Sequence, residues 1–186
     1  MINLMIEKEN IDSWDAIFMQ EATLWSRRSH DIQTQCGCVI VKDKTVISTG
    51  YNGFIRDIDD LCLPNTRPQK YPFMIHAEAN AIYNAVRLGR STLDSTIYIT
   101  APPCLGCLQM LYQCGIKSVI YSDISEPKMV IYNDNYTKMI DMISQKMSFR
   151  YLPKSKLDIT FLKESVEKIE KIEKKIKKPI DIDDIV

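Results

Sequence analysis

Residues 95–122 read STIYITAPPCLGCLQMLYQCGIKSVIYS and contain two short β-branched runs around a helical stretch. The runs STIYIT (95–100) and KSVIYS (117–122) predict strands. The stretch CLGCLQMLYQCG (104–115) predicts a helix that ends at Gly115. A strand–helix–strand unit of this kind indicates an α/β fold with a parallel sheet.

The segments outside this unit continue the alternation of strands and helices. WDAIFMQEATLWSRR has apolar residues three and four apart, which predicts a helix that Asp12 or Ser13 caps. The other expected elements are a hairpin at 36–53, a loop at 54–72, a helix from Ile75 to Leu88 stopped by Gly89, a helix within 133–147 and a strand at 148–152. We therefore expect a mixed, mostly parallel five-stranded sheet with helices on both faces and the hairpin at its antiparallel edge.

The chain changes character near residue 162. KESVEKIEKIEKKIKK is dense in Lys and Glu, so we expect a domain over 1–161 and a charged, partly helical tail over 162–186. One interpretation is a solvated tail, because charge-dense segments bury little apolar surface. The alternative is an apolar stripe that packs on a neighbouring subunit or a partner, formed by Val166, Ile169, Ile172 and Ile176.

The overall charge excludes some partners. The 24 Lys and Arg residues balance 24 Asp and Glu residues, so no basic field indicates nucleic acid or a membrane surface. No apolar run approaches the roughly 18 residues of a membrane span, and the N-terminus lacks a signal-peptide layout. We expect a cytoplasmic protein, in which the 6 cysteines favour metal or redox chemistry over disulfides.

The triplet His76-Ala77-Glu78 and the pair Cys104 and Cys107 carry the chemistry. Each group opens an expected helix, and a parallel sheet can bring two such helix starts to one edge. One His and two Cys form a zinc site with an open fourth position, which is typical of catalytic zinc. Glu78, two residues from His76, then faces the same cavity as a proton carrier.

Each motif alone is weak. CxxC also occurs in redox pairs and structural zinc sites, and a lone HAE occurs by chance. The two motifs together match the H-x-E and P-C-x-x-C signature of zinc nucleobase deaminases.

Several segments together resemble the deoxycytidylate deaminase family: GYNG (50–53), KYPFMIHAEANAI (70–82), APPCLGC (101–107), RSHDIQTQCGCVIV (28–41) and SFRYLPKSKLDITF (148–161). The resemblance implies a three-layer α/β/α cytidine deaminase-like fold and hydrolysis of dCMP to dUMP and ammonia, which supplies thymidylate synthesis. It implies one catalytic Zn²⁺ held by His76, Cys104 and Cys107, with zinc-bound hydroxide attacking cytosine C4 and Glu78 as the proton shuttle.

The resemblance also implies substrate contacts. The Ala77 N–H is expected at the base O2, a carbonyl near Pro102 at the leaving amine, and Asn52 at the sugar 3′-hydroxyl. For Asn52 the alternative is turn chemistry, because Asn-Gly is a common hairpin signal. For the phosphate the candidates are Arg28 and then Tyr121, whose alternatives are a helix-ending cation and a core residue.

By the same resemblance, the chain is expected to form a homohexamer regulated by dCTP and dTTP, with Mg²⁺ accompanying a nucleotide effector. The effector would dock at the loop that carries GYNGF. Ile55 stands where the family commonly has proline, and IRDIDD (55–60) is more acidic than a triphosphate site suggests, so dCTP regulation is left open.

Other readings stay open. The rival enzyme is a dCTP deaminase or one that accepts both dCMP and dCTP, and the rival of another class is a non-catalytic nucleotide-sensing zinc protein. A polynucleotide deaminase is disfavoured by the neutral charge. Cys36 and Cys38 are interpreted as core residues, with a second zinc site that adds Cys62 and His30 as the alternative.

Overall fold

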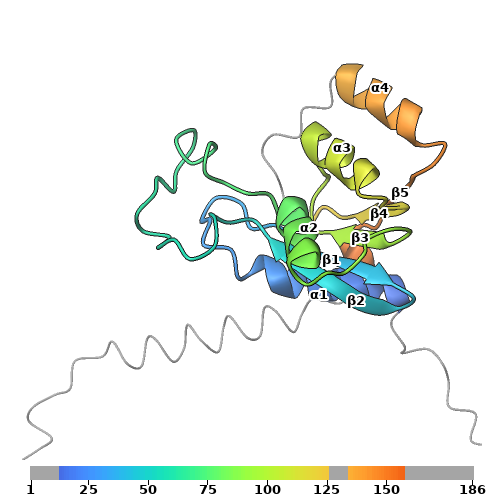
Figure 1. The fold of residues 1–186 in the computed structure, drawn as a ribbon, viewed down its shortest axis with the longest axis horizontal. Helices are drawn as coiled ribbons and strands as arrows, with labels where there is room; N and C mark the ends of the chain where they lie inside the picture. Colours follow the sequence, from blue (N-terminus) through green and yellow to red (C-terminus); the bar gives the residue numbers. More distant parts are fainter. Residues whose placement is uncertain (1–12, 126–133, 158–186) are drawn as a thin grey trace, which may run out of the picture.

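The computed structural model describes residues 13–125 and 134–157 (Figure 1). The elements there are α1 (Trp14–Ser26), β1 (Gly37–Lys42), β2 (Thr45–Tyr51), α2 (Ala77–Arg87), β3 (Thr96–Ile99), α3 (Leu105–Gln113), β4 (Ser118–Tyr121), α4 (Asp134–Ile143), β5 (Ser148–Tyr151) and the 3-10 helix η2 (Lys154–Lys156). The domain boundary near 161, the tail at 162–186 and its apolar stripe lie outside the described residues.

The five strands form one sheet in the order β2-β1-β3-β4-β5. β1 pairs antiparallel with β2 and with β3, whereas β3, β4 and β5 pair in parallel. β1 therefore runs against the other four strands, and the opening hairpin lies at one edge. This confirms the expected mixed sheet.

Strand side chains alternate between the two faces of the sheet, as strand geometry requires. One face packs against α2, α3 and α4 through Cys38, Ile40, Ile97, Ile99 and Val119. The other face packs against α1 through Val39, Val41, Tyr98 and Ile120. Figure 1 shows α1 on one side of the sheet and the other three helices on the opposite side, so the three-layer arrangement is confirmed.

A capping serine and two glycines begin and end helices where the sequence predicted. The Ser13 hydroxyl caps α1 by accepting from the Ala16 N–H. Gly89 and Gly115, with φ of 62° and 75°, follow α2 and α3 in the left-handed conformation that favours glycine. Among the described residues, no helix is both long enough and apolar enough to cross a membrane.

Helix α2 begins at Ala77, two residues later than the pattern suggested. Ile75 pairs with Gly53 in an isolated antiparallel bridge, and His76 keeps an extended backbone as the N-cap. The bridge ties the end of the 54–74 loop to the residue that follows Asn52. The tertiary contact thus delays the helix and fixes where His76 stands.

Candidate metal centre and adjoining pocket

Two helix N-termini converge on one point. His76 is the N-cap of α2, Cys104 is the N-cap of α3, and Cys107 lies in the first turn of α3. The ligand atoms of these three residues lie within 4.8 Å of one another. The structure therefore brings together the three ligands that the sequence suggested.

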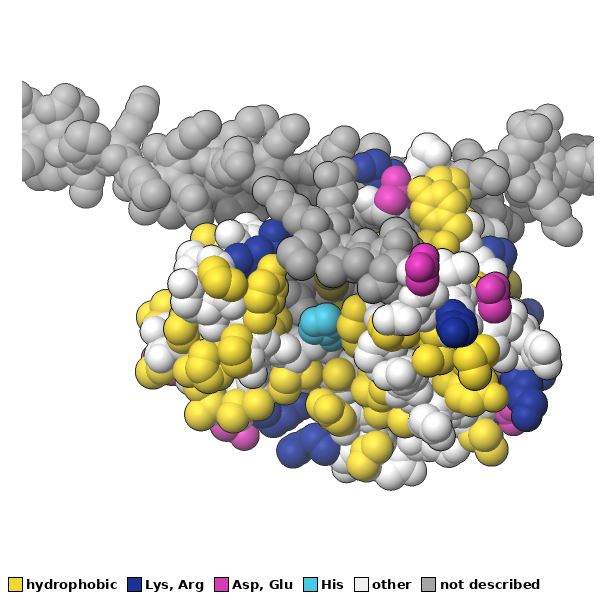
Figure 2. Space-filling model, turned by 90° about the horizontal axis from the view of Figure 1, so that it is seen from above, with side chains coloured by type: hydrophobic (Ala, Val, Ile, Leu, Met, Phe, Trp, Pro, Cys, Tyr) yellow, Lys and Arg dark blue, Asp and Glu magenta, His cyan; other side chains and the backbone are white. Residues whose placement is uncertain are grey.

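The distances in this triad fit a zinc ion. The His76 Nδ1 atom lies 3.5 Å from the Sγ atom of Cys104 and 3.5 Å from that of Cys107. Tetrahedral zinc with Zn–S of about 2.3 Å and Zn–N of about 2.0 Å separates such atoms by about 3.5 Å. His76 is exposed, Cys104 is half-buried and Cys107 is buried. Figure 2 shows a histidine side chain reaching the surface between two groups of hydrophobic side chains.

The three ligands also shift one another's protonation. Contact with Cys107, and then with His76, lowers the pKa of the Cys104 thiol to about 4. The hydrogen bond to Cys104 raises the pKa of His76 to about 9, and contact with Cys104 raises the pKa of Cys107. A thiolate is the form of cysteine that binds metal, so Cys104 is ready to do so.

Glu78 lies on the first turn of α2 and is only 5% exposed. Burial raises the pKa of this carboxyl, while the nearby His76 opposes the shift. The Cys107 side chain is a hydrogen-bonding neighbour of Glu78, which places the carboxyl beside the triad. A carboxyl with a raised pKa beside a metal site is suited to take and return protons.

Two backbone groups expected to bind the base lie next to these ligands. Ala77, fully buried, is the first residue of α2, and N–H groups at that position have no acceptor within the helix. Pro102 is half-buried and precedes Cys104 by two residues. The Tyr136 hydroxyl of α4 donates to the carbonyl of the adjacent Pro103 at 3.0 Å, a contact with no signal in the sequence.

Asn52 follows β2 and is 6% exposed. Its Oδ1 atom accepts from the Cys36 N–H at 2.7 Å, and its Nδ2 atom donates to the Thr34 carbonyl at 2.8 Å. Asn52 therefore does not form the hairpin turn, because Asp43 and Lys44 connect β1 to β2 with φ of 49° and 59°. The turn interpretation of this asparagine is wrong.

The two phosphate candidates have different surroundings. Tyr121, half-buried at the end of β4, packs its ring against Tyr151 with centroids 5.7 Å apart and contacts the core. Arg28 follows α1 and lies 5.9 Å from the centroid of the Tyr51 ring. It lines a separate cavity that His76, Glu78 and the two cysteines do not line.

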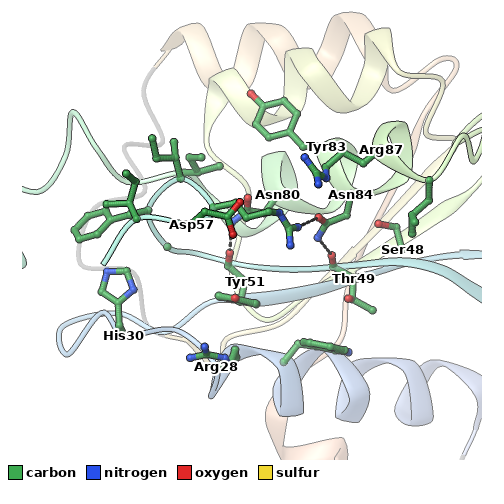
Figure 3. Close-up of a pocket in the computed structure, with 18 of the residues that line it drawn as sticks. Arg28, His30, Ser48, Thr49, Tyr51, Asp57, Asn80, Tyr83, Asn84 and Arg87 are labelled. Atoms are coloured by element: carbon green, nitrogen blue, oxygen red, sulfur yellow. Dashed lines mark hydrogen bonds between the residues drawn. The ribbon is translucent and has the colours of Figure 1, made fainter. Parts of the chain in front are cut away.

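This cavity, of about 990 Å³, lies between α1, β2 and α2 (Figure 3). Arg28 borders it on the α1 side, while Asn84 and Arg87 of α2 border it on the other side of β2. Arg56 enters from the 54–74 loop and donates to Asn84 Oδ1 at 2.7 Å. The arginines in its lining are Arg28, Arg56, Arg87 and Arg90, and the acids are Asp57 and Asp60.

The alternative second zinc site does not assemble. His30 Nδ1 lies 3.1 Å from an Asp60 oxygen, and Cys62 is exposed. Within 13–125 and 134–157, the one group of at least three metal-binding side chains is the triad already described. Cys38 is fully buried and Cys36 partly so, as the core interpretation expected.

The family model described as the cytidine and deoxycytidylate deaminase zinc-binding region matches residues 12–123. A Caenorhabditis elegans protein described as a probable deoxycytidylate deaminase is 40% identical over 109 residues, which cover 56% of this chain and 54% of that protein. A Drosophila melanogaster protein with the same description is 30% identical over 155 residues, covering 77% of this chain and 74% of that protein. The match thus spans about half of the nematode protein's length.

The described architecture also occurs in a solved enzyme. The dCMP deaminase of cyanophage S-TIM5 in apo form aligns with a TM-score of 0.59 and 26% identity, over 74% of this chain and 96% of that chain. The phage enzyme in complex with dCMP and dUMP aligns with a TM-score of 0.58 and 25% identity, over 73% of this chain and 94% of that chain.

Proposed function

The chain belongs to the cytidine and deoxycytidylate deaminase zinc-binding family, and from this premise we propose that it hydrolyses dCMP to dUMP and ammonia. The observation that carries the proposal is the buried carboxyl of Glu78 beside three metal-binding side chains. Three protein ligands leave a position of tetrahedral zinc open for water, and a structural site would not need the carboxyl. The substrate is taken from the names of the relatives and of the phage enzyme.

Zinc held by His76, Cys104 and Cys107 supplies a Lewis acid that lowers the pKa of water toward neutrality. Glu78 takes the proton that the water loses as its oxygen bonds to C4, and gives that proton to N3 of the cytosine. It then passes a second proton from the new hydroxyl to the amine, so that the C4–N4 bond breaks and ammonia leaves. The raised pKa of Glu78 suits it to hold each proton between these transfers.

The neighbouring groups hold the nucleotide in this proposal. The Ala77 N–H donates to the base O2, a carbonyl near Pro102 accepts from the amine, and Asn52 contacts the sugar. For the phosphate, Arg28 and Tyr121 stay predictions. The separate position of Arg28 in the α1–α2 cavity argues against its role there.

One assay tests the proposed activity. Ammonia release is followed from dCMP, dCTP, deoxycytidine and single-stranded DNA with zinc-loaded protein. We expect turnover of dCMP above the other three. Preference for dCTP would overturn the substrate, and no turnover of any substrate would favour the nucleotide-sensing alternative.

Regulation by dCTP and dTTP belongs to the same proposal. The cavity between α1 and α2 is lined by the end of GYNGF and by four arginines, and these charges suit a polyanionic nucleotide. Asp57 and Asp60 also line it, and they would either repel the phosphates or hold Mg²⁺. The assay is repeated with each nucleotide as effector, with Arg87→Ala as the cavity variant. If a nucleotide changes the activity of the wild type but not that of the variant, the cavity is supported as the effector site. If neither nucleotide changes the activity of the wild type, regulation is removed from the proposal. The hexamer stays a prediction, and sedimentation equilibrium would test it by measuring the mass of the assembly.

A further inference from the structure

Lys70 is the first residue of the KYPFMIHAEANAI segment, and it is the largest fully buried side chain in the described part of the chain. Its Nζ atom lies 2.5 Å and 2.6 Å from the two carboxylate oxygens of Asp31, which is also 2% exposed. Lysine is almost never buried unless it is paired, because removing both charges from water is costly. An apolar pair of similar volume would hold these loops at a lower cost in desolvation free energy, so packing alone does not explain the two charges.

Asp31 has other partners besides Lys70. Its Oδ1 atom accepts from the N–H groups of Gln33 and Thr34, at 2.8 Å and 3.2 Å. Its Oδ2 atom accepts from Asn52 Nδ2 at 3.3 Å. The buried pair therefore reaches the residue expected to contact the sugar.

These partners leave one orientation for the Asn52 amide. The Nδ2 side faces two acceptors, Asp31 Oδ2 and the Thr34 carbonyl, while Oδ1 faces the Cys36 N–H. A rotated amide would set its NH₂ group against the Cys36 N–H and its oxygen against the carboxylate. An amide oxygen accepts two hydrogen bonds, so Oδ1 keeps capacity for a donor such as a sugar hydroxyl.

Lys70 also connects this amide to the metal centre. Its carbonyl accepts from the N–H groups of Phe73 and Met74, at 3.0 Å and 3.1 Å, and this turn leads into the Gly53–Ile75 bridge and then His76. Met74 Sδ lies 3.8 Å from Asn52 Nδ2. One buried ion pair thus ties the approach to α2 to the end of β2.

We infer that Asp31 and Lys70 are positioning residues for nucleotide recognition: together they hold the Asn52 amide with Oδ1 as the acceptor for the sugar 3′-hydroxyl. The inference rests on the proposed function, since it assigns a determinant of substrate specificity within that site. It adds a residue pair that neither contacts the metal triad nor needs to touch the nucleotide.

The test compares dCMP with 2′,3′-dideoxycytidine monophosphate, which lacks the 3′-hydroxyl. In Asp31→Asn/Lys70→Met, the new amide oxygen keeps the bonds from Gln33 and Thr34, no charge is left unpaired, and an N–H now faces Asn52 Nδ2. We expect the wild type to prefer dCMP by about tenfold in kcat/KM, the size of one lost hydrogen bond. The double variant should lose that preference, mainly through a higher KM for dCMP, with dideoxy turnover changed less than about twofold.

Asp15→Asn/Arg150→Met is the control, because it removes a different ion pair, between α1 and β5. This control should keep the preference of the wild type. Unchanged preference in the Asp31/Lys70 variant, or no preference in the wild type, would overturn the inference. Absence of dCMP turnover in the wild type would instead overturn the proposed function.

A second measurement needs neither activity nor a folded double variant. Side-chain amide hydrogen exchange of Asn52 is read by NMR in the wild type, with Asn52→Asp identifying the resonance. Protection of the Nδ2 protons supports the fixed orientation. Rapid exchange at the rate of a free amide overturns it.

Discussion

Glu78 combines an ionisable group with almost complete burial. Burial favours the neutral acid, so its pKa rises, while His76 pulls in the other direction. Glu78 is not one of the three side chains that form the metal-binding group. Its function and the binding of the metal are therefore separable by mutation.

Glu78→Gln preserves the shape of the side chain and removes its proton transfer. We expect kcat for dCMP to fall by at least about 10²-fold, because general acid–base catalysis contributes on that scale. Zinc content, measured by mass spectrometry, should stay at one ion per chain. His76→Ala, as the comparison, should lose the zinc. Loss of zinc from the Gln variant would show that Glu78 is a ligand.

Asp15 forms an ion pair with Arg150 away from the metal centre. The bond from Arg150 lowers the pKa of this carboxyl below its usual value, and the Tyr98 hydroxyl also donates to it at 2.8 Å. Because the folded pKa is lower than the unfolded one, the pair contributes stability above the unfolded pKa. That stability is lost as the pH falls through the folded pKa.

A double-mutant cycle with Asp15→Asn and Arg150→Met measures this contribution by urea unfolding. We expect a coupling free energy of about 0.2–1 kcal/mol at pH 7, the range for partly exposed pairs, and a smaller value at pH 3. A coupling that grows on acidification would contradict the assigned sign.

Two glycines in the β1–β2 hairpin allow helices α1 and α2 to approach it closely. A Cβ atom on Gly50 of β2 would lie 2.2 Å from the Ala77 carbonyl oxygen, in the first turn of α2. A Cβ atom on Gly37 of β1 would lie 2.1 Å from the Ala22 carbonyl oxygen of α1. In both cases the atom that the Cβ would meet belongs to the helix backbone, so the helix itself would have to move.

Gly50→Ala and Gly37→Ala form a matched pair. Each should reduce the free energy of unfolding by about 1–3 kcal/mol or more, as overpacked substitutions do. Only Gly50→Ala should weaken zinc binding, measured by competition with a chromophoric chelator, because only it displaces the turn that follows His76. Equal zinc affinity in the two variants would mean that this close approach does not position the ligand.

The order of the strands in the sheet explains why motifs that are distant in the sequence meet. β3 and β4 pair in parallel in the centre of the sheet, α3 connects them, and α2 packs against α3 on the same face. The starts of these two helices share the metal centre. A metal ion there should therefore hold the two helices together and stabilise the folded state.

Removing the metal tests this coupling. A ligand present at about 1,000 times its Kd stabilises by about 4 kcal/mol, which for a chain of this size corresponds to a Tm change of about 10 °C. We expect a chelator to lower Tm by that order and added zinc to restore it. Cys107→Ser should show little response to either. An unchanged Tm in the wild type would contradict a zinc ion bound between the helices.

The alternation of strands and helices, the hairpin, the glycine stops and the residues of the metal centre could all be predicted from the amino-acid sequence. The elements follow from local periodicity and turn residues, which involve only neighbouring residues. The metal centre follows from two short motifs that are distant in the sequence and are informative only together. The start of α2 after the Ile75 bridge and the place of Arg28 in a separate cavity became visible only in the folded chain. So did the contact of Lys70 with Asp31 across 39 residues and that of Tyr136 with Pro103 across 33. Such pairings depend on how the chain packs around one core, and no local pattern encodes which distant side chain fills a given space.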